Sequence, residues 1–276
     1  MLKCIDFDKE FSLYAEKWIA ANRKKYKNMD QLEEQIPEVY LRWLNTPAQW
    51  LDGRTPGEWF AQFDDAEELV DLMREYQKKG ISLPDPLLER VSDLGEEAAA
   101  PLMQLVREYG KDRGLAVAAL NLLVETGSAA PMEMCMDIIA EADGQNELTD
   151  VSSELLTGLG DAVIEPILSR MGNVTKTAED AFLDVLCNFP GDERIYTYTV
   201  NAFLRRYEKR ALYASYLGKL GDPRAIEPLA KVLKMSDLSY LDYIEIANAI
   251  EALGGEVSEE REFNGDPYYE SLKKMK

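Results

Sequence analysis

The residue types that could do chemistry in this chain are limited, because its 276 residues include no histidine. Ser-His-Asp and Cys-His catalysis and H-E-x-x-H zinc sites are therefore excluded. The three cysteines, Cys4, Cys135 and Cys187, lie far apart and form no Cys-x-x-Cys pair. Structural zinc takes four ligands at short spacings, so we expect no metal site. We also expect reduced thiols and a cytoplasmic protein, because no apolar leader follows a basic start.

Carboxylate pairs are the remaining candidates for acid-base chemistry. Three adjacent pairs are Asp64 with Asp65, Glu96 with Glu97, and Glu259 with Glu260. In a chain with 51 acidic residues such pairs arise by chance, and solvated surface is their expected role. We therefore assign no catalytic residue and expect the protein not to be an enzyme.

Two glycine-containing stretches resemble cofactor loops only in part. Residues 158–163 begin like G-x-G-x-x-G but lack its third glycine, and no strand precedes them. Residues 172–177 lack the two-glycine frame of a phosphate loop. The sequence therefore predicts no cofactor, and residues 158–163 fit a turn between helices.

The charge balance argues against anionic partners. The formal net charge is −20, with 12 basic and 17 acidic residues in 1–85, and 19 and 34 in 86–276. Nucleic-acid binding needs clustered Lys and Arg, so we expect neither nucleic acid nor an anionic membrane as partner. Mean hydropathy is −0.32 and no apolar run reaches about 18 residues, so no membrane span is expected. The charge fits either simple solubility or a basic partner.

A turn pattern recurs along the second part of the chain. A leucine or similar residue, a glycine, a small or acidic stretch and then a proline with an apolar residue return at positions 94–102, 126–132, 159–167 and 220–229. The prolines are 30, 35 and 62 residues apart, and a weaker copy at 189–195 supplies the missing repeat. Such a period indicates stacked helical repeats.

Each repeat has a clear physical interpretation. The glycine ends one helix in the left-handed conformation, and a following Asp or Ser caps the next helix. The proline lies early in that helix, where a missing N–H has little cost. Apolar residues then recur at helical spacing, as in Ile226, Leu229 and Leu233. This periodicity predicts helix over residues 195–200, despite their strand-like alternation, and helix above about 60% of the chain with essentially no sheet.

Residues 210–229, Arg-Ala-Leu-Tyr-Ala-Ser-Tyr-Leu-Gly-Lys-Leu-Gly-Asp-Pro-Arg-Ala-Ile-Glu-Pro-Leu, resemble the short bacterial HEAT-like repeats of phycobilisome-lyase type. Tyr213 and Tyr216 stand where that family usually has alanine. The resemblance implies an ion pair between Arg210 and a loop aspartate, here Asp222. It also implies an all-α fold, an α-α superhelix of about five HEAT-like repeats over residues 86–256.

Residues 1–85 contain all four tryptophans and no repeat. Helical spacing in Phe11, Tyr14 and Trp18, and an acidic helix ended by Gly80, predict an N-terminal helical segment that caps the repeats. Residues 40–80 also resemble, weakly, the toxin-binding domain of ParS/Xre-type antitoxins. Residues 257–276 form a C-terminal tail, weakened by acidic repulsion from Glu256 to Glu262, although Tyr268, Tyr269 and Leu272 could dock on the last repeat.

The resemblance is specific for the fold and says little about function, because function depends on sites placed on a fold. We expect a non-enzymatic protein-interaction scaffold. In HEAT-like solenoids the second helix of each repeat lines the concave face. That frame predicts a partner-binding stripe of Asn121, Glu125, Glu154, Asp184, Asn188, Glu208, Ser215, Lys219, Glu245 and Asn248. An acidic groove would hold a basic helix or extended segment of another protein. Two alternatives remain open: a regulatory or toxin-neutralising module acting through residues 40–80, and a lyase-type enzyme by fold analogy.

Overall fold

The computed structural model describes residues 3–109, 113–257 and 261–275. Helices make up 73% of the chain, and the described residues contain no strand. The expected all-α repeat solenoid is confirmed. Backbone contacts divide the chain into two compact units, Met1–Met134 and Cys135–Lys276. Each unit is described by itself.

The first unit contains seven α-helices and three short 3₁₀ turns among its described residues. The helices are α1 (Phe7–Asn22), α2 (Met29–Glu33), α3 (Ile36–Leu44), α4 (Ala66–Lys79), α5 (Asp85–Asp93), α6 (Glu96–Tyr109) and α7 (Arg113–Thr126). The 3₁₀ turns are η1 (Arg23–Lys25), η2 (Gln49–Leu51) and η3 (Trp59–Gln62). The expected acidic helix is α4, and Gly80 ends it with φ of 63°. Helices α6 and α7 pack as the first repeat pair.

An aromatic cluster holds the N-terminal segment together. The Phe7 ring lies 5.5 Å from Phe60, 5.7 Å from Trp50 and 6.0 Å from Trp43. The buried hydroxyl of Tyr76 on α4 donates to the Ile5 carbonyl, 2.6 Å away. Trp43 and Trp50 therefore serve packing within the first unit.

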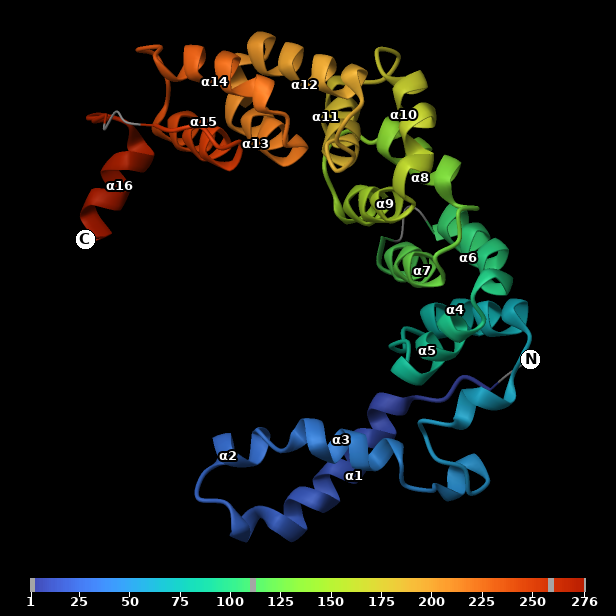
Figure 1. The fold of residues 1–276 in the computed structure, drawn as a ribbon. Coiled ribbons are helices and arrows are strands. Elements are labelled where there is room, and N and C mark those ends of the chain that lie inside the picture. The colour runs from blue at the N-terminus through green and yellow to red at the C-terminus, as the bar shows by residue number, and fades with distance from the viewer. Residues whose placement is uncertain (1–2, 110–112, 258–260, 276) are drawn as a thin grey trace. The chain divides into compact units, whose positions relative to one another are not determined.

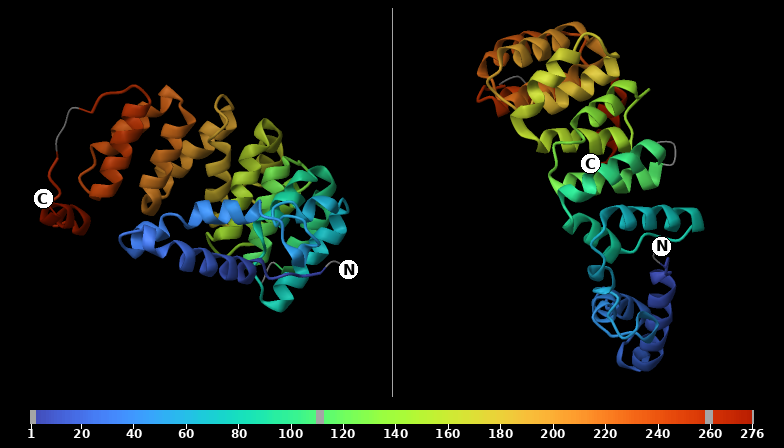
Figure 2. Two further views of the ribbon diagram at one scale, coloured as in Figure 1. Left: turned by 90° about the horizontal axis from the view of Figure 1, so that it is seen from below. Right: turned by 90° about the vertical axis from the view of Figure 1, so that its right-hand side faces the viewer.

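In its described residues the second unit contains four pairs of helices, the first of which begins just before the unit, and a final helix. Figures 1 and 2 show these helices following one another along the chain. The first helices of the pairs are α8 (Met132–Glu141), α10 (Ile164–Arg170), α12 (Glu193–Arg205) and α14 (Ile226–Leu233). The second helices are α9 (Glu147–Gly158), α11 (Lys176–Leu186), α13 (Arg210–Leu220) and α15 (Tyr240–Ala252), and α16 (Pro267–Met275) follows. The 3₁₀ turns are η4 (Gly160–Val163), η5 (Tyr207–Lys209) and η6 (Pro223–Ala225). Residues 195–200 lie within α12, as the repeat periodicity predicts.

The turn between α13 and α14 shows the expected cap chemistry. Gly221 ends α13 in the left-handed conformation with φ of 74°. The Asp222 carboxylate accepts a hydrogen bond from the Arg224 backbone N–H at 2.9 Å. Pro228 is the third residue of α14, as expected, but the corresponding Pro101 lies further inside α6.

The ion pair between Arg210 and Asp222 does not form. Asp222 instead pairs with Arg224 at 2.6 Å, and the Arg210 guanidinium lies over the Tyr207 ring, 4.6 Å from its centre. Arg210 begins α13 and Asp222 follows its end, so roughly 15 Å of helix separates the two. Arginines do link neighbouring repeats elsewhere, since Arg224 also pairs with Glu193 at 2.8 Å.

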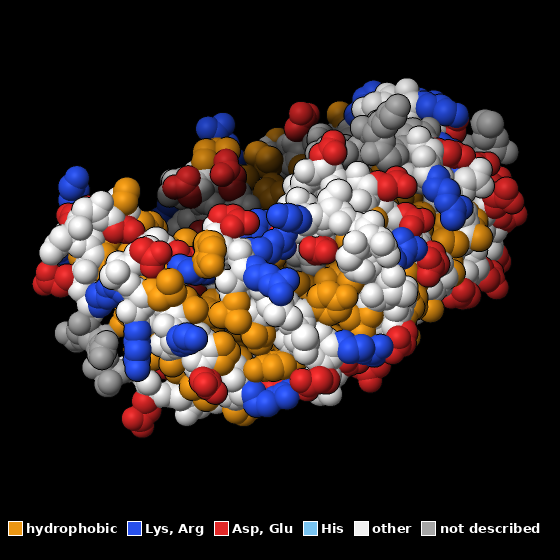
Figure 3. All heavy atoms as spheres, turned by 90° about the horizontal axis from the view of Figure 1, so that it is seen from above, with side chains coloured by type: hydrophobic (Ala, Val, Ile, Leu, Met, Phe, Trp, Pro, Cys, Tyr) orange, Lys and Arg blue, Asp and Glu red, His pale blue; other side chains and the backbone are white. Residues whose placement is uncertain are grey.

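The face shown in Figure 3 carries acidic and basic side chains interspersed with apolar ones.

The C-terminal tail was expected either to be weakly held or to dock on the last repeat. For residues 261–275 the structure shows docking on α15. Phe263 is buried, and its ring lies 5.1 Å from that of Tyr243 on α15. The Tyr269 ring lies 4.9 Å from Tyr240, and the Asp266 carboxylate accepts from the Tyr240 backbone N–H. The expected repulsion at Glu259 and Glu260 concerns residues outside the described ranges.

Candidate functional site

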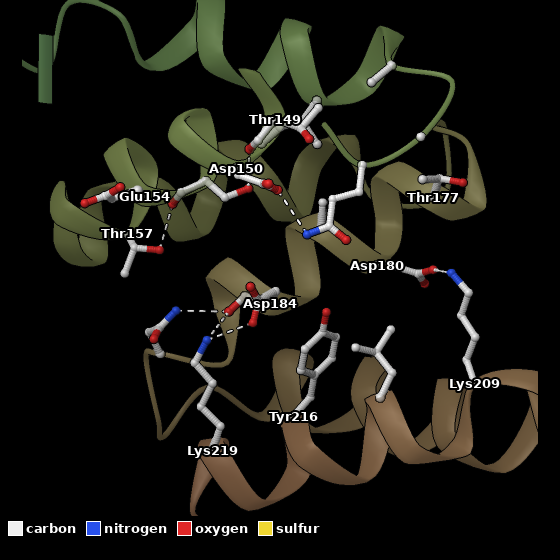
Figure 4. A pocket seen from close by; sticks show the side chains of 18 of the residues that line it. Thr149, Asp150, Glu154, Thr157, Thr177, Asp180, Asp184, Lys209, Tyr216 and Lys219 are labelled. Carbon is white, nitrogen blue, oxygen red and sulfur yellow. Dashed lines mark hydrogen bonds and ion pairs between the residues drawn. The ribbon is translucent and has the colours of Figure 1, made fainter. Parts of the chain in front are cut away.

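The second unit contains a groove of about 830 Å³ along the helices α9, α11 and α13 (Figure 4). Four carboxylates line it, from Asp150 and Glu154 on α9 and from Asp180 and Asp184 on α11. Two ammonium groups, of Lys209 and Lys219, also line it. Carboxylates therefore outnumber cations two to one in the groove wall.

Helix geometry places the carboxylates in pairs. Asp150 and Glu154 are four residues apart on α9, and Asp180 and Asp184 have the same spacing on α11, so each pair shares one helix face. A capping box defines the start of α9: the Asn146 side chain accepts from the Thr149 backbone N–H, and the Asn146 N–H donates to the Thr149 hydroxyl. The cap thereby fixes the residue at which α9 begins.

The carboxylates on α9 have no cation beside them. Asp150 accepts a hydrogen bond from the neutral Gln145 side chain at 3.0 Å. Within the described part of the chain, the Glu154 carboxylate has neither an ion pair nor a side-chain hydrogen bond. Both residues are exposed. Like charges at this spacing destabilise a helix by about 0.2–0.5 kcal/mol, so a bound cation would relieve a real repulsion.

The two carboxylates on α11 are paired in different ways. The Asp180 side chain is 8% exposed and bonds to Arg206, Lys209 and the Tyr213 hydroxyl. Asp184 is 48% exposed and accepts from the Lys219 ammonium at 2.9 Å. The first arrangement is a buried structural cluster. The second is a surface ion pair, of a kind worth about 0–1 kcal/mol.

Tyr216 lies in the groove wall beneath these groups. Its side chain is 8% exposed and lines the groove, and Figure 4 shows its hydroxyl directed from α13 toward α11. No group in the described residues forms a hydrogen bond with that hydroxyl. Burial, and then the charges of Asp184 and Asp180, raise the pKa of Tyr216 far above its ordinary value. The hydroxyl therefore stays protonated and is open to a ligand.

The groove brings together four of the ten residues predicted from the second-helix frame, namely Glu154, Asp184, Asn188 and Lys219. Ser215 and Glu208 do not line it; the Ser215 hydroxyl donates to the Leu212 carbonyl. Glu245 and Asn248 lie on α15, outside the groove lining. Asn121 and Glu125 are exposed on α7 of the first unit. None of the ten is buried.

Sequence reasoning missed Asp150, Asp180, Lys209 and Tyr216 as groove residues. A signal for three of them was present. Asp150 and Asp180 each precede a predicted acidic residue by four positions, which places both on the same helix face. Tyr216 departs from the alanine usual at its position, but the departure alone does not indicate which way the ring points.

The cysteines offer no reactive centre in the second unit. Burial raises the pKa of Cys135 to about 11 and that of Cys187 to about 11. In the described residues, no three His, Cys, Asp or Glu side chains gather in a way that could hold a metal ion. In the same residues, no helix is long and apolar enough to cross a membrane.

The PBS lyase HEAT-like repeat family model matches residues 214–235, which run from α13 through the turn into α14. This match supports HEAT-like repeats in an all-helical chain. No curated protein matches the chain. The matched segment lies outside residues 40–80, so their resemblance to antitoxin domains stays a prediction. The fold and the match together define a helical repeat protein with a HEAT-like repeat at residues 214–235. HEAT-like repeats commonly mediate protein interactions.

Proposed function

We propose that this protein is a non-enzymatic interaction module whose second unit binds a basic segment of another protein in the groove along α9, α11 and α13. The observation that carries the proposal is the Asp150–Glu154 pair. Both carboxylates face the groove, and neither has a cationic partner in the described residues.

Charge complementarity supports a basic occupant. Asp180 and Asp184 line the same groove but already pair with cations of the chain, so the excess negative charge comes from Asp150 and Glu154. A cleft with excess negative charge concentrates cations and raises their association rate. Phosphate-bearing partners would meet like charge there, which argues against nucleic acid. The groove residues hold no nucleophile activated by a neighbouring base, so a binding role accounts for them without chemistry.

Charge reversal at Asp150 and Glu154 tests the proposal. The probe is an acetylated, amidated ten-residue peptide in which arginine alternates with serine, and a glutamate-for-arginine version is the negative probe. Asp161→Lys with Glu251→Lys is the matched control, because both residues are exposed and outside the groove lining. Affinity is measured by calorimetry at low salt.

The expected result is that Asp150→Lys with Glu154→Lys weakens arginine-peptide binding at least tenfold and flattens its salt dependence, whereas the control pair has a small effect. Helix content, measured by circular dichroism, should be the same in both. Equal losses in the two double variants would show that binding follows net charge alone, and the groove would be rejected.

The two alternatives lack a specific supporting observation. The antitoxin-like module would act through residues 40–80, where the aromatic side chains Trp43, Trp50 and Phe60 are engaged in packing on Phe7. The lyase alternative depends on the family name, and a pigment or small molecule that co-purifies in the groove would favour it.

A further inference from the structure

The ion pair between Lys219 and Asp184 is a feature of the groove that the proposed function leaves unexplained. The Lys219 ammonium lies 2.9 Å from an Asp184 carboxylate oxygen and 2.9 Å from the Asp184 carbonyl oxygen. Thirty-five residues separate the two, so α13 brings this cation to α11. It lies at the same carboxylate that a basic ligand would use.

This cation is held weakly. The Lys219 side chain is 37% exposed and Asp184 is 48% exposed, and ion pairs between such exposed groups contribute little because water and salt screen them. The Asp180 cluster differs, because its carboxylate is buried and bonded by three groups. A ligand can therefore exchange with Lys219 at Asp184 but not with Arg206 at Asp180.

Tyr216 is the second, independent observation at this place. The Tyr216 side chain is more than nine-tenths buried, and its hydroxyl is directed into the groove. Among such side chains of the groove lining, it is the only one in the described part of the chain whose polar group has no hydrogen-bond partner. A bound ligand that covers this hydroxyl without forming a hydrogen bond to it deprives it of water, at a cost in binding affinity. A ligand with a donor near Asp184 avoids this cost, because the phenol oxygen can accept from it.

We propose that Asp184 and Tyr216 form the binding subsite for one arginine side chain of the partner, and that Lys219 occupies this subsite as an intramolecular substitute until the partner arrives. This inference rests on the proposed function. A guanidinium is planar with five N–H donors, so it can bond the Asp184 carboxylate and the Tyr216 oxygen together. The positive charge of the bound guanidinium would also lie in the same groove as the Glu154 carboxylate, which has no cation beside it in the described residues.

Removing the substitute cation should strengthen binding. We expect Lys219→Met to tighten arginine-peptide binding about fivefold, from the loss of a competing ion pair and of one like charge. Lys231→Met is the matched control, because Lys231 is exposed on α14 and lies outside the groove lining, and its replacement changes net charge by the same amount. It should change affinity less than twofold.

Removing the phenol oxygen should weaken binding. Tyr216→Phe keeps the ring and the groove wall, and we expect about a fivefold loss of affinity for the arginine peptide. Replacing the arginines of the peptide with lysine should reduce both the effect of Tyr216→Phe and the affinity, because an ammonium cannot match the planar fork.

The outcomes separate this inference from the proposed function. If Lys219→Met and Lys231→Met change affinity equally, or Tyr216→Phe binds as the parent does, the arginine subsite is wrong even though the groove still binds through Asp150 and Glu154. If neither the parent nor Lys219→Met binds the arginine peptide at low salt, the proposed function itself fails.

Discussion

The buried carboxylate of Asp180 should be a main determinant of stability in the second unit. It joins α11 to the segment after α12 and to α13, through Arg206, Lys209 and Tyr213. Asp180→Ala would leave the Tyr213 hydroxyl without its carboxylate acceptor and the Arg206 guanidinium, 12% exposed, without its counter-charge. Because Arg206 and Tyr213 are largely buried, the loss of their partner should lower the free energy of unfolding.

The magnitude can be estimated from the two kinds of partner. Removing one member of a buried ion pair costs about 3–5 kcal/mol, whereas an exposed partner adds little. The Lys209 side chain is 41% exposed, so its ion pair with Asp180 adds little to the free energy of unfolding. We therefore expect Asp180→Ala to lower the free energy of unfolding by about 3 kcal/mol, and the melting temperature by roughly 10 °C for a unit of this size.

Urea unfolding followed by circular dichroism at 222 nm measures this loss. Tryptophan fluorescence reports the first unit alone, because all four tryptophans lie within residues 18–59. Asp161→Ala is the matched control: it removes the same charge at an exposed position of the same unit. Asp180→Asn retains an acceptor for Tyr213 and should fall between the two. A difference below about 1 kcal/mol between Asp180→Ala and Asp161→Ala would refute the argument from burial.

Three further predictions follow from local geometry. Gly221→Val should lower stability by about 1–2 kcal/mol in thermal melts, because φ of 74° disfavours a β-branched residue although no atom lies within 4 Å of an added Cβ; coincident melts would contradict this. At pH 8 a thiol reagent should leave Cys135 and Cys187 unmodified until urea is added, since burial raises the pKa of each to about 11; rapid labelling of either in the native protein would contradict the burial. The side-chain hydrogen bond from Arg194 lowers the pKa of Asp192 to about 2. The stability that the ionised Asp192 contributes is therefore present above about pH 4 and is lost as the pH falls toward 2. Arg194→Ala should return the pKa of Asp192, measured by NMR, toward 3.8.

The repeat architecture was predictable from the sequence because it depends on local rules. Helix-ending glycines such as Gly80 and Gly221, and capping residues such as Asp192, act within a few residues of their own position. Helical periodicity likewise assigned residues 195–200 to a helix against their strand-like alternation. The same periodicity placed Glu154 and Asp184 on one face of their helices, and both face the groove.

The partners of the groove side chains were not predictable in this way. Asp180 meets Arg206 and Tyr213 across 26 and 33 residues, and Lys219 meets Asp184 across 35. The family pattern also gave the wrong partner for Asp222, which pairs with the neighbouring Arg224. Side chains of the predicted stripe therefore differ in role: Glu154 is unpaired in the groove, whereas Ser215 lies outside it.

The sequence by itself determined the helices, their caps and the face on which each side chain lies, because backbone hydrogen bonding and the 3.6-residue repeat are local. Only the tertiary structure decided which faces come together, because side-chain volumes set the spacing between helices. Gly218 brings α13 close to α15, where an added Cβ would lie 3.3 Å from the Ala249 Cα. Toward α11 the same helix carries the buried rings of Tyr213 and Tyr216, and the backbones of α13 and α11 approach each other less closely than those of α13 and α15. That difference in spacing leaves room for the acidic groove.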